Sequence, residues 1–232
     1  MTACFAEYAV VPEVCCIPVP EALPFPLAAL IGCAVTTGVG AVLNKARGQA
    51  GESVAVFGVG GIGLSSLLAA RYAGADPIIA VDTNEEKLAL AKSCGATHGL
   101  INNADAIGAI RDLTEGRGAD YVFEAVGIPA VQEQCLSAAR PGGNIILAGL
   151  SPMGSVTNFP GALLTRQEKT VAGTYYGSSD MAQDFPRFAR MHLEGKLDLS
   201  LLISRSYPLE NINDAFVEML SGKIGRSVIL FE

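Results

Sequence analysis

Several features that mark particular classes of protein are absent from the 232 residues of this chain. There is no tryptophan and no basic tract, and the net charge is −7, which argues against nucleic acid or an anionic membrane as a partner. No apolar run reaches about 18 residues without a glycine, a proline or a polar break, so no membrane span is expected. The first seven residues lack a basic region followed by an apolar one, so a signal peptide is not expected either.

The cysteines do not form a recognisable metal motif. No C-x-x-C occurs and no histidine stands at ligand spacing from a cysteine, so a structural zinc knot is not expected. Scattered cysteines fit a reducing, cytoplasmic location, in which most of them act as small buried hydrophobic residues. The six cysteines are Cys4, Cys15, Cys16, Cys33, Cys94 and Cys135.

The chain is organised around residues 53–82. Half of all residues are hydrophobic, enough for a large core in one α/β domain or in one and a half smaller ones. Residues 53–57 have the pattern of a buried strand, a glycine-rich turn and an apolar helical run follow, and residues 78–82 form a second strand pattern that ends in an acid. This order is typical of the βαβ unit that binds a dinucleotide.

Each residue type in the turn has a physical role. Gly58 permits a tight turn, Gly60 lets the backbone approach a pyrophosphate, and Gly63 lets the helix pack on the strand. The helix N-terminus offers unpaired N–H groups to an anion. Asp82 follows Gly63 at close to the spacing expected for the acid that binds the ribose hydroxyls. The candidate coenzyme residues of the turn are Gly58, Gly60, Gly61, Ile62 and Gly63. A glycine-rich turn with no ligand remains the alternative.

After Asp82, strand and helix patterns keep alternating. This alternation predicts an α/β fold of the Rossmann type, a doubly wound parallel sheet with helices on both faces. Ligands of such sheets lie at the carboxyl ends of the strands. Two further strand ends therefore become candidate coenzyme sites, Val126 with Gly127 and Ala148 with Gly149, although ordinary strand-end glycines would look the same.

The two ends of the chain do not fit this sheet. Residues 5–11 alternate like a strand, but closely spaced prolines follow, and such a segment cannot form its own core. Residues 227–231 form a strand pattern that has no obvious partner in the doubly wound sheet. We therefore expect residues 1–34 to be a remnant of another domain, 35–176 to be the dinucleotide-binding domain, and 177–232 to return to that other domain.

Several motifs together resemble the zinc-type medium-chain alcohol dehydrogenases along almost the full chain. Besides the glycine-rich turn, the motifs lie at residues 5–8, 32–41, 79–82, 118–120, 124–127 and 222–227. The resemblance implies a two-domain oxidoreductase that uses NAD and zinc and transfers a hydride between an alcohol or aldehyde and NAD. This chain would be its coenzyme-binding portion.

The resemblance also implies roles for single residues. Cys33 is similar to one of the ligands of the catalytic zinc, and Thr37 is similar to a neighbour of the nicotinamide. Asp82 and Lys87 match contacts to the adenosine ribose. Arg226 matches an arginine that reaches the pyrophosphate, where a guanidinium gives charge-assisted hydrogen bonds.

The chain departs from the family in one respect. The other zinc ligands of these enzymes belong to an N-terminal catalytic domain, and this chain begins after the corresponding motifs. A catalytic zinc needs about three protein ligands, so Cys33 alone cannot hold it and could be a buried thiol. We expect NAD binding with no turnover by the chain itself. A stand-alone NAD-binding module without catalysis is the alternative, while Cys33 argues against a zinc-free reductase.

Coenzyme choice and association can also be predicted. The carboxylate of Asp82 would repel a 2′-phosphate, and residues 83–86 include no arginine to receive one, so we expect NAD rather than NADP. An apolar stretch at residues 156–164 is expected at the exposed edge of the sheet. Because relatives pair there, we expect a homo-oligomer, a dimer or tetramer; a loop covered within the monomer is the alternative.

Overall fold

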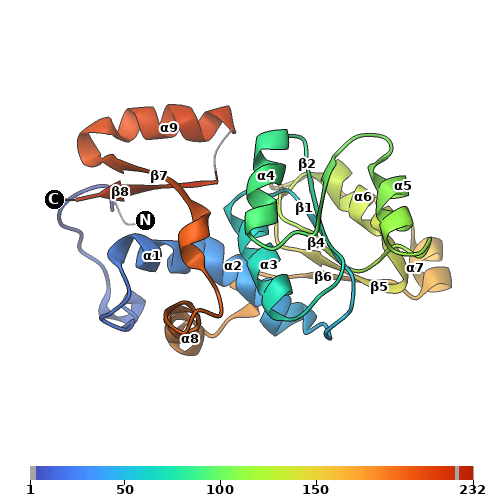
Figure 1. The fold of residues 1–232 in the computed structure, drawn as a ribbon, viewed down its shortest axis with the longest axis horizontal. Helices are drawn as coiled ribbons and strands as arrows, with labels where there is room; N and C mark the ends of the chain where they lie inside the picture. Colours follow the sequence, from blue (N-terminus) through green and yellow to red (C-terminus); the bar gives the residue numbers. More distant parts are fainter. Residues whose placement is uncertain (1–3, 223–224, 232) are drawn as a thin grey trace.

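The computed structural model describes residues 4–222 and 225–231, and its largest element is a six-stranded parallel sheet (Figure 1). The strand order is β3-β2-β1-β4-β5-β6, so the chain runs outward from β1 in one direction and then returns to build the other half. This confirms the predicted doubly wound fold. The strands are β1 (Val54–Phe57), β2 (Ile78–Asp82), β3 (His98–Ile101), β4 (Ala119–Glu124), β5 (Ala139–Leu147) and β6 (Thr170–Gly173).

The sheet is buried on both faces, which is why its central strands are almost uniformly apolar. In β1, Val54 and Val56 pack into one hydrophobic cluster, while Ala55 and Phe57 pack into another on the opposite face. The first face is covered by α3 (Gly61–Tyr72) and α4 (Glu85–Ser93), while α8 (Met181–Leu193) extends the same core by packing on the helical segment before β1. The second face is covered by α5 (Ala106–Leu113), α6 (Pro129–Ala138) and α7 (Gly161–Gln167).

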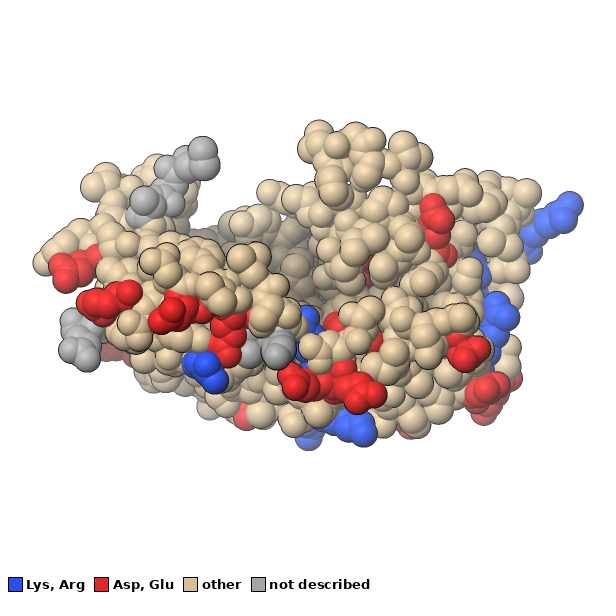
Figure 2. All heavy atoms as spheres, turned by 90° about the horizontal axis from the view of Figure 1, so that it is seen from above, with Lys and Arg blue, Asp and Glu red and all other residues tan. Residues whose placement is uncertain are grey.

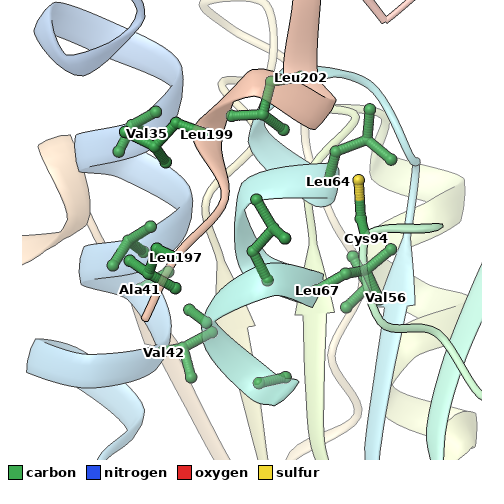
Figure 3. Close-up of a cluster of buried hydrophobic side chains, with 14 of the residues drawn as sticks. Val35, Ala41, Val42, Val56, Leu64, Leu67, Cys94, Leu197, Leu199 and Leu202 are labelled. Atoms are coloured by element: carbon green, nitrogen blue, oxygen red, sulfur yellow. The ribbon is translucent and has the colours of Figure 1, made fainter. Parts of the chain in front are cut away.

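Figure 3 shows the core on the first face, where side chains of a long N-terminal helical segment meet α3 and the residues after α8. In that segment, Phe25–Ala46, a π-helical turn at Ile31–Val35 joins α1 (Phe25–Leu30) to α2 (Thr36–Gly40), and a second at Ala41–Ala46 extends α2. The segment packs so closely on α3 that a Cβ on Gly38 would lie only 2.3 Å from the carbonyl oxygen of Ile62.

The Phe25–Ala46 segment also corrects the prediction about long apolar runs. It has 22 residues and a mean hydropathy of 1.9, enough to cross a membrane by length and composition, because its glycines do not break the helix. However, 67% of its most apolar window is buried inside the molecule, which is typical of a core helix. In the described residues no other helix is both long and apolar enough.

The described residues before Phe25 form only one short 3₁₀ turn, Glu13–Cys15, and most of them are exposed. The expected strand at residues 5–11 is wrong, because no neighbouring strand offers its backbone a partner there. The Phe5 ring instead meets the Phe216 ring edge-on, with 5.9 Å between centroids, and ties this segment to α9 (Ile212–Ser221).

The end of the chain forms a second, two-stranded parallel sheet. β7 (Ile203–Pro208) pairs with β8 (Arg226–Leu230), and α9 connects them. The final strand therefore has no partner in the doubly wound sheet, as expected, and pairs instead with β7, which the sequence did not predict. The polar residues inside β7 gave no strand signal in the sequence.

The edge of the large sheet also differs from the prediction. Its outer strand is β6, whereas residues 156–160 are irregular and lead into α7.

Candidate functional site

The turn between β1 and α3 depends on glycine for reasons that differ from position to position. Gly58 has a φ of +87°, a conformation that other residues rarely adopt. A Cβ on Gly63 would lie 1.9 Å from the carbonyl oxygen of Gly58, so this glycine allows the helix to sit on the strand end. Gly60 is different, because its φ is −76° and a Cβ there would meet no atom within 4 Å. The described chain gives no packing reason for glycine at position 60, and the space beside it is open.

The helix that follows this turn begins without a side-chain cap. Gly60 is the N-cap of α3, and it carries no side chain that could accept from the first N–H groups of the helix. Such a helix start is a site for an anion, because its N–H groups and the helix dipole both favour negative charge.

Asp82 lies at the end of β2, beside the same turn. One oxygen of its carboxylate accepts from the backbone N–H of Val59 at 2.8 Å, and the other accepts from the N–H of Asn84 at 3.0 Å. The carboxylate therefore braces the glycine turn and still has lone pairs free for hydroxyl groups. It lines a cavity of about 370 Å³ together with Gly58, Gly60 and Lys87.

Lys87 is placed by the start of α4. The side chain of Asn84 caps this helix by accepting from the N–H of Glu86 at 2.8 Å. Lys87 then lines both the cavity beside Asp82 and an adjoining cavity of about 350 Å³ beside Gly61 and Ile62.

Arg226 comes from the opposite end of the chain. It begins β8 and lies against the start of α3, because a Cβ on Gly61 would lie 1.9 Å from its Nε atom. This Nε atom is buried and has no hydrogen-bond partner among the described residues. A buried unpaired guanidinium nitrogen is costly, and an anion between it and the helix N-terminus would satisfy it. On the face shown in Figure 2, acidic side chains are spread along the molecule while lysine and arginine are few and dispersed.

The ends of β4 and β5 form the third part of the site. Gly127 has a φ of +84°, and a Cβ on Gly149 would lie 2.2 Å from the backbone nitrogen of Gly127. These two glycines are thus required by the packing of the two turns against each other. The side chain of Glu124 is fully buried behind them and accepts from the N–H groups of Val126 and Gly127, each at 2.7 Å.

A larger cavity, of about 790 Å³, opens beyond these turns. Cys33 and Thr37 line it from the Phe25–Ala46 segment, and Ala148 and Gly149 line it from the end of β5. Cys33 sits in the π-helical turn Ile31–Val35, a feature that is frequent at functional sites. Thr37 is buried, whereas Cys33 is exposed and is not the buried thiol that was its alternative.

The buried cysteines have no part in this chemistry. Burial, and then the negative charge of Glu124, raise the pKa of the Cys135 thiol well above its ordinary value. Burial, and then Asp198, raise the pKa of the Cys94 thiol to about 12. Both thiols stay protonated at neutral pH and are unreactive.

The donor set for zinc is incomplete. Within residues 4–222 and 225–231, no group of three or more His, Cys, Asp or Glu side chains could hold a metal ion. Cys33 is one thiol, and a catalytic zinc needs about three protein ligands. The residues described here therefore do not fit a bound catalytic zinc.

The residues at the carboxyl end of the sheet, in contrast, fit a bound dinucleotide. They provide an open space that a Cβ at Gly60 would fill, a buried Arg226 nitrogen without a partner among the described residues, and the Asp82 carboxylate at the end of β2. The candidate residues predicted from the sequence line three adjoining cavities, except Gly63 and Gly127, which line none of them. The role of each stays a prediction.

The sequence reasoning gave no role to Glu124 or to Gln132, a buried residue of α6 that lines the large cavity. A carboxylate inside an apolar strand was the signal that could have found Glu124.

Comparison with known proteins gives consistent matches. A family model described as "Zinc-binding dehydrogenase" matches residues 61–192. The chain is 36% identical over 237 residues to an S-(hydroxymethyl)glutathione dehydrogenase of Paracoccus denitrificans, covering 98% of this chain and 62% of that protein. It is 34% identical to a putative alcohol dehydrogenase D of Mycobacterium tuberculosis, covering 99% of this chain and 63% of that protein.

Solved structures agree. An alcohol dehydrogenase zinc-binding domain protein from Burkholderia ambifaria has a TM-score of 0.88 and 36% identity, covering 93% of this chain and 58% of that one. A benzyl alcohol dehydrogenase from Acinetobacter calcoaceticus also has a TM-score of 0.88, with 31% identity, covering 93% of this chain and 59% of that one. The chain thus spans about three fifths of the length of these relatives.

Proposed function

Because the chain belongs to the zinc-binding dehydrogenase family, we propose that it binds NAD and forms the coenzyme-binding part of an alcohol dehydrogenase. The observation that carries the proposal is the convergence of Gly60, Asp82 and Arg226 on one end of the sheet. The start of α3 and Arg226 would bind the pyrophosphate between them. Asp82 and Lys87 would bind the adenosine ribose, and the nicotinamide would enter the large cavity beside Thr37.

We propose NAD rather than NADP as the coenzyme. The Asp82 carboxylate is held in place by two backbone N–H groups, so it cannot easily turn away from a 2′-phosphate. The repulsion between the two negative groups would disfavour NADP.

The catalytic part of the proposal is limited by the donor set. When bound, NAD would accept a hydride from an alcohol carbon, or NADH would return it to an aldehyde. The described residues offer only Cys33 toward the zinc of the family, so we propose that this chain binds coenzyme without turning over an alcohol by itself. Metal analysis of the purified chain should find far less than one zinc per chain, and a stoichiometric content would contradict this.

We also propose the domain division at residues 34 and 176, association into a dimer or tetramer, and a cytoplasmic location. The separate β7–β8 sheet and the largely exposed residues before Phe25 support the division, although the Phe25–Ala46 segment crosses its first boundary without a break. The exposed outer strand β6 supports pairing between copies. Six free cysteines support a reducing compartment.

Calorimetry with NAD and NADP tests the coenzyme proposal. The unaltered chain should bind NAD and bind NADP more weakly. Asp82→Asn removes the charge, so NAD affinity should fall by on the order of tenfold and the gap to NADP should narrow. Asp105→Asn is the control, because Asp105 is an exposed carboxylate whose side chain caps nothing. The ribose role is wrong if the Asp82 variant and the control bind NAD equally well.

A further inference from the structure

Glu124 is a buried carboxylate whose position the coenzyme chemistry does not require. It ends β4, its side chain is fully buried, and one of its oxygens accepts from two successive N–H groups, those of Val126 and Gly127. Its backbone carbonyl accepts in addition from the N–H groups of Ala148 and Gly149, each at 2.9 Å. One residue therefore holds the turn after β4 and the turn after β5 together.

The second carboxylate oxygen fills the space between these two turns. A Cβ on Gly149 would lie 2.7 Å from it, so no side chain fits there. This oxygen also faces the side-chain amide of Gln132, 3.4 Å away. The same amide nitrogen donates to the hydroxyl of Ser151 at 2.9 Å, and the amide oxygen accepts from the hydroxyl of Thr157.

The network extends to the loop that follows β5. Gln132, Gly149 and Ser151 all line the 790 Å³ cavity, whereas Glu124 and Thr157 do not. The buried carboxylate thus acts on this cavity through other residues. It fixes the turns directly and fixes the loop through Gln132. The cavity beside Asp82 depends less on the network, since Asp82 has its own hydrogen bonds to the glycine turn.

We propose that Glu124 is a positioning residue that sets the affinity for the nicotinamide half of the coenzyme, an inference that rests on the proposed NAD function. With its Gln132 and Thr157 partners, it holds the turns and the loop in the shape that the nicotinamide and its ribose require. The adenosine half, bound at Asp82 and Arg226, depends less on this network, although Val126, one of the residues that Glu124 holds, lines the cavity beside Asp82.

Glu124→Gln keeps the shape of the side chain but removes its negative charge and adds an NH₂ group. The new amide can still accept from Val126 and Gly127 through its oxygen, but these hydrogen bonds lose the assistance of the carboxylate charge and become weaker. The NH₂ group then faces the NH₂ group of Gln132, so the Gln132 amide must turn over, and the hydroxyls of Ser151 and Thr157 must exchange their donor and acceptor roles. The turns and the loop are therefore held less tightly.

The test compares two ligands by calorimetry on the full 232-residue chain: NAD, which needs both halves of the site, and ADP, which lacks the nicotinamide half. For Glu124→Gln we expect the dissociation constant of NAD to rise on the order of tenfold and that of ADP to stay within about twofold. Thr157→Val removes one hydroxyl from the network, and we expect a smaller change in the same direction.

Asp120→Asn is the matched control. Asp120 is a buried carboxylate at the opposite end of the same strand, bonded to Ser53 and Arg140. Asp120→Asn should lower the unfolding temperature and leave the ratio of NAD to ADP affinity unchanged. If Glu124 had only a structural role, Glu124→Gln would give this same result.

The outcomes separate this inference from the proposed function. If the unaltered chain binds neither ADP nor NAD, the proposed function fails and the inference fails with it. If it binds both and Glu124→Gln leaves their ratio unchanged, only the inference fails. Should Glu124→Gln not fold, the ratio measured for Thr157→Val decides, and an unchanged ratio would overturn the inference.

Discussion

Replacing Gly60 by alanine separates coenzyme binding from folding. A Cβ at this position meets no atom of the described chain within 4 Å, and the φ of −76° suits alanine. Alanine reduces the entropy of the unfolded chain, worth about 0.4–1 kcal/mol, but is a poorer N-cap than glycine by a similar amount. The free energy of unfolding of Gly60→Ala should therefore stay within about 1 kcal/mol of the unaltered chain.

The affinity for NAD, in contrast, should fall strongly in Gly60→Ala. The new methyl group occupies the space where the pyrophosphate would approach the backbone. Loss of one charge-assisted hydrogen bond costs about 1.5–3 kcal/mol, which corresponds to roughly a ten- to hundredfold rise in the dissociation constant.

Thermal unfolding with and without NAD measures both effects. At a hundred times the dissociation constant, NAD should stabilise the unaltered chain by about 2.7 kcal/mol. A variant that binds a hundredfold more weakly would gain only about 0.4 kcal/mol at the same concentration. Gly108→Ala is the control, because a Cβ there also meets nothing but lies on α5, away from the cavities. If Gly60→Ala gains as much from NAD as this control, the turn does not bind the pyrophosphate.

Three further predictions concern single side chains. Arg226→Met should fold normally, because the Nε atom has no hydrogen-bond partner to lose among the described residues. ADP titrations of this variant at low and high salt should show on the order of tenfold weaker binding and a smaller dependence of the affinity on salt. Burial alone would raise the pKa of Asp120, but hydrogen bonds from Ser53 and Arg140 outweigh it and lower the pKa. The ionised Asp120 carboxylate therefore stabilises the fold fully above its unfolded pKa of about 4, and this stabilisation is lost as the pH falls through the folded pKa. Urea unfolding should show that acidification lowers the free energy of unfolding less for Asp120→Asn than for the unaltered chain. Iodoacetamide at about pH 8 should modify the exposed Cys33 and not Cys94, whose pKa is raised to about 12, and mass spectrometry showing rapid native-state labelling of Cys94 would contradict its burial.

The doubly wound sheet could be predicted because its signals are local and agree with one another. The strand and helix patterns that alternate after Asp82 correspond to β3, β4 and β5 with helices between them, and Asn84 caps α4, which has two acids in its first turn. Each apolar run must be buried on both faces, and only a parallel sheet covered by helices provides this. The position of Asp82 beside the glycine turn follows from the same βαβ geometry.

The features that the sequence did not predict share a different cause. β7 is polar inside, so only its pairing with β8 identifies it as a strand. Residues 5–11 alternate like a strand but have no partner, and strand pairing is a tertiary property that a local pattern does not contain. The role of Glu124 depends on the distance between two turns that are far apart in sequence, and the buried state of Arg226 Nε depends on this side chain reaching the start of α3 from the start of β8. Contacts of this kind appear only after the chain has folded.

A crystal structure of the chain soaked with NAD would test the central claim most directly. The account predicts density for the pyrophosphate between the first N–H groups of α3 and the guanidinium of Arg226, and for the adenosine ribose within hydrogen-bond distance of Asp82. Density for the coenzyme elsewhere, or a ribose out of reach of that carboxylate, would contradict it.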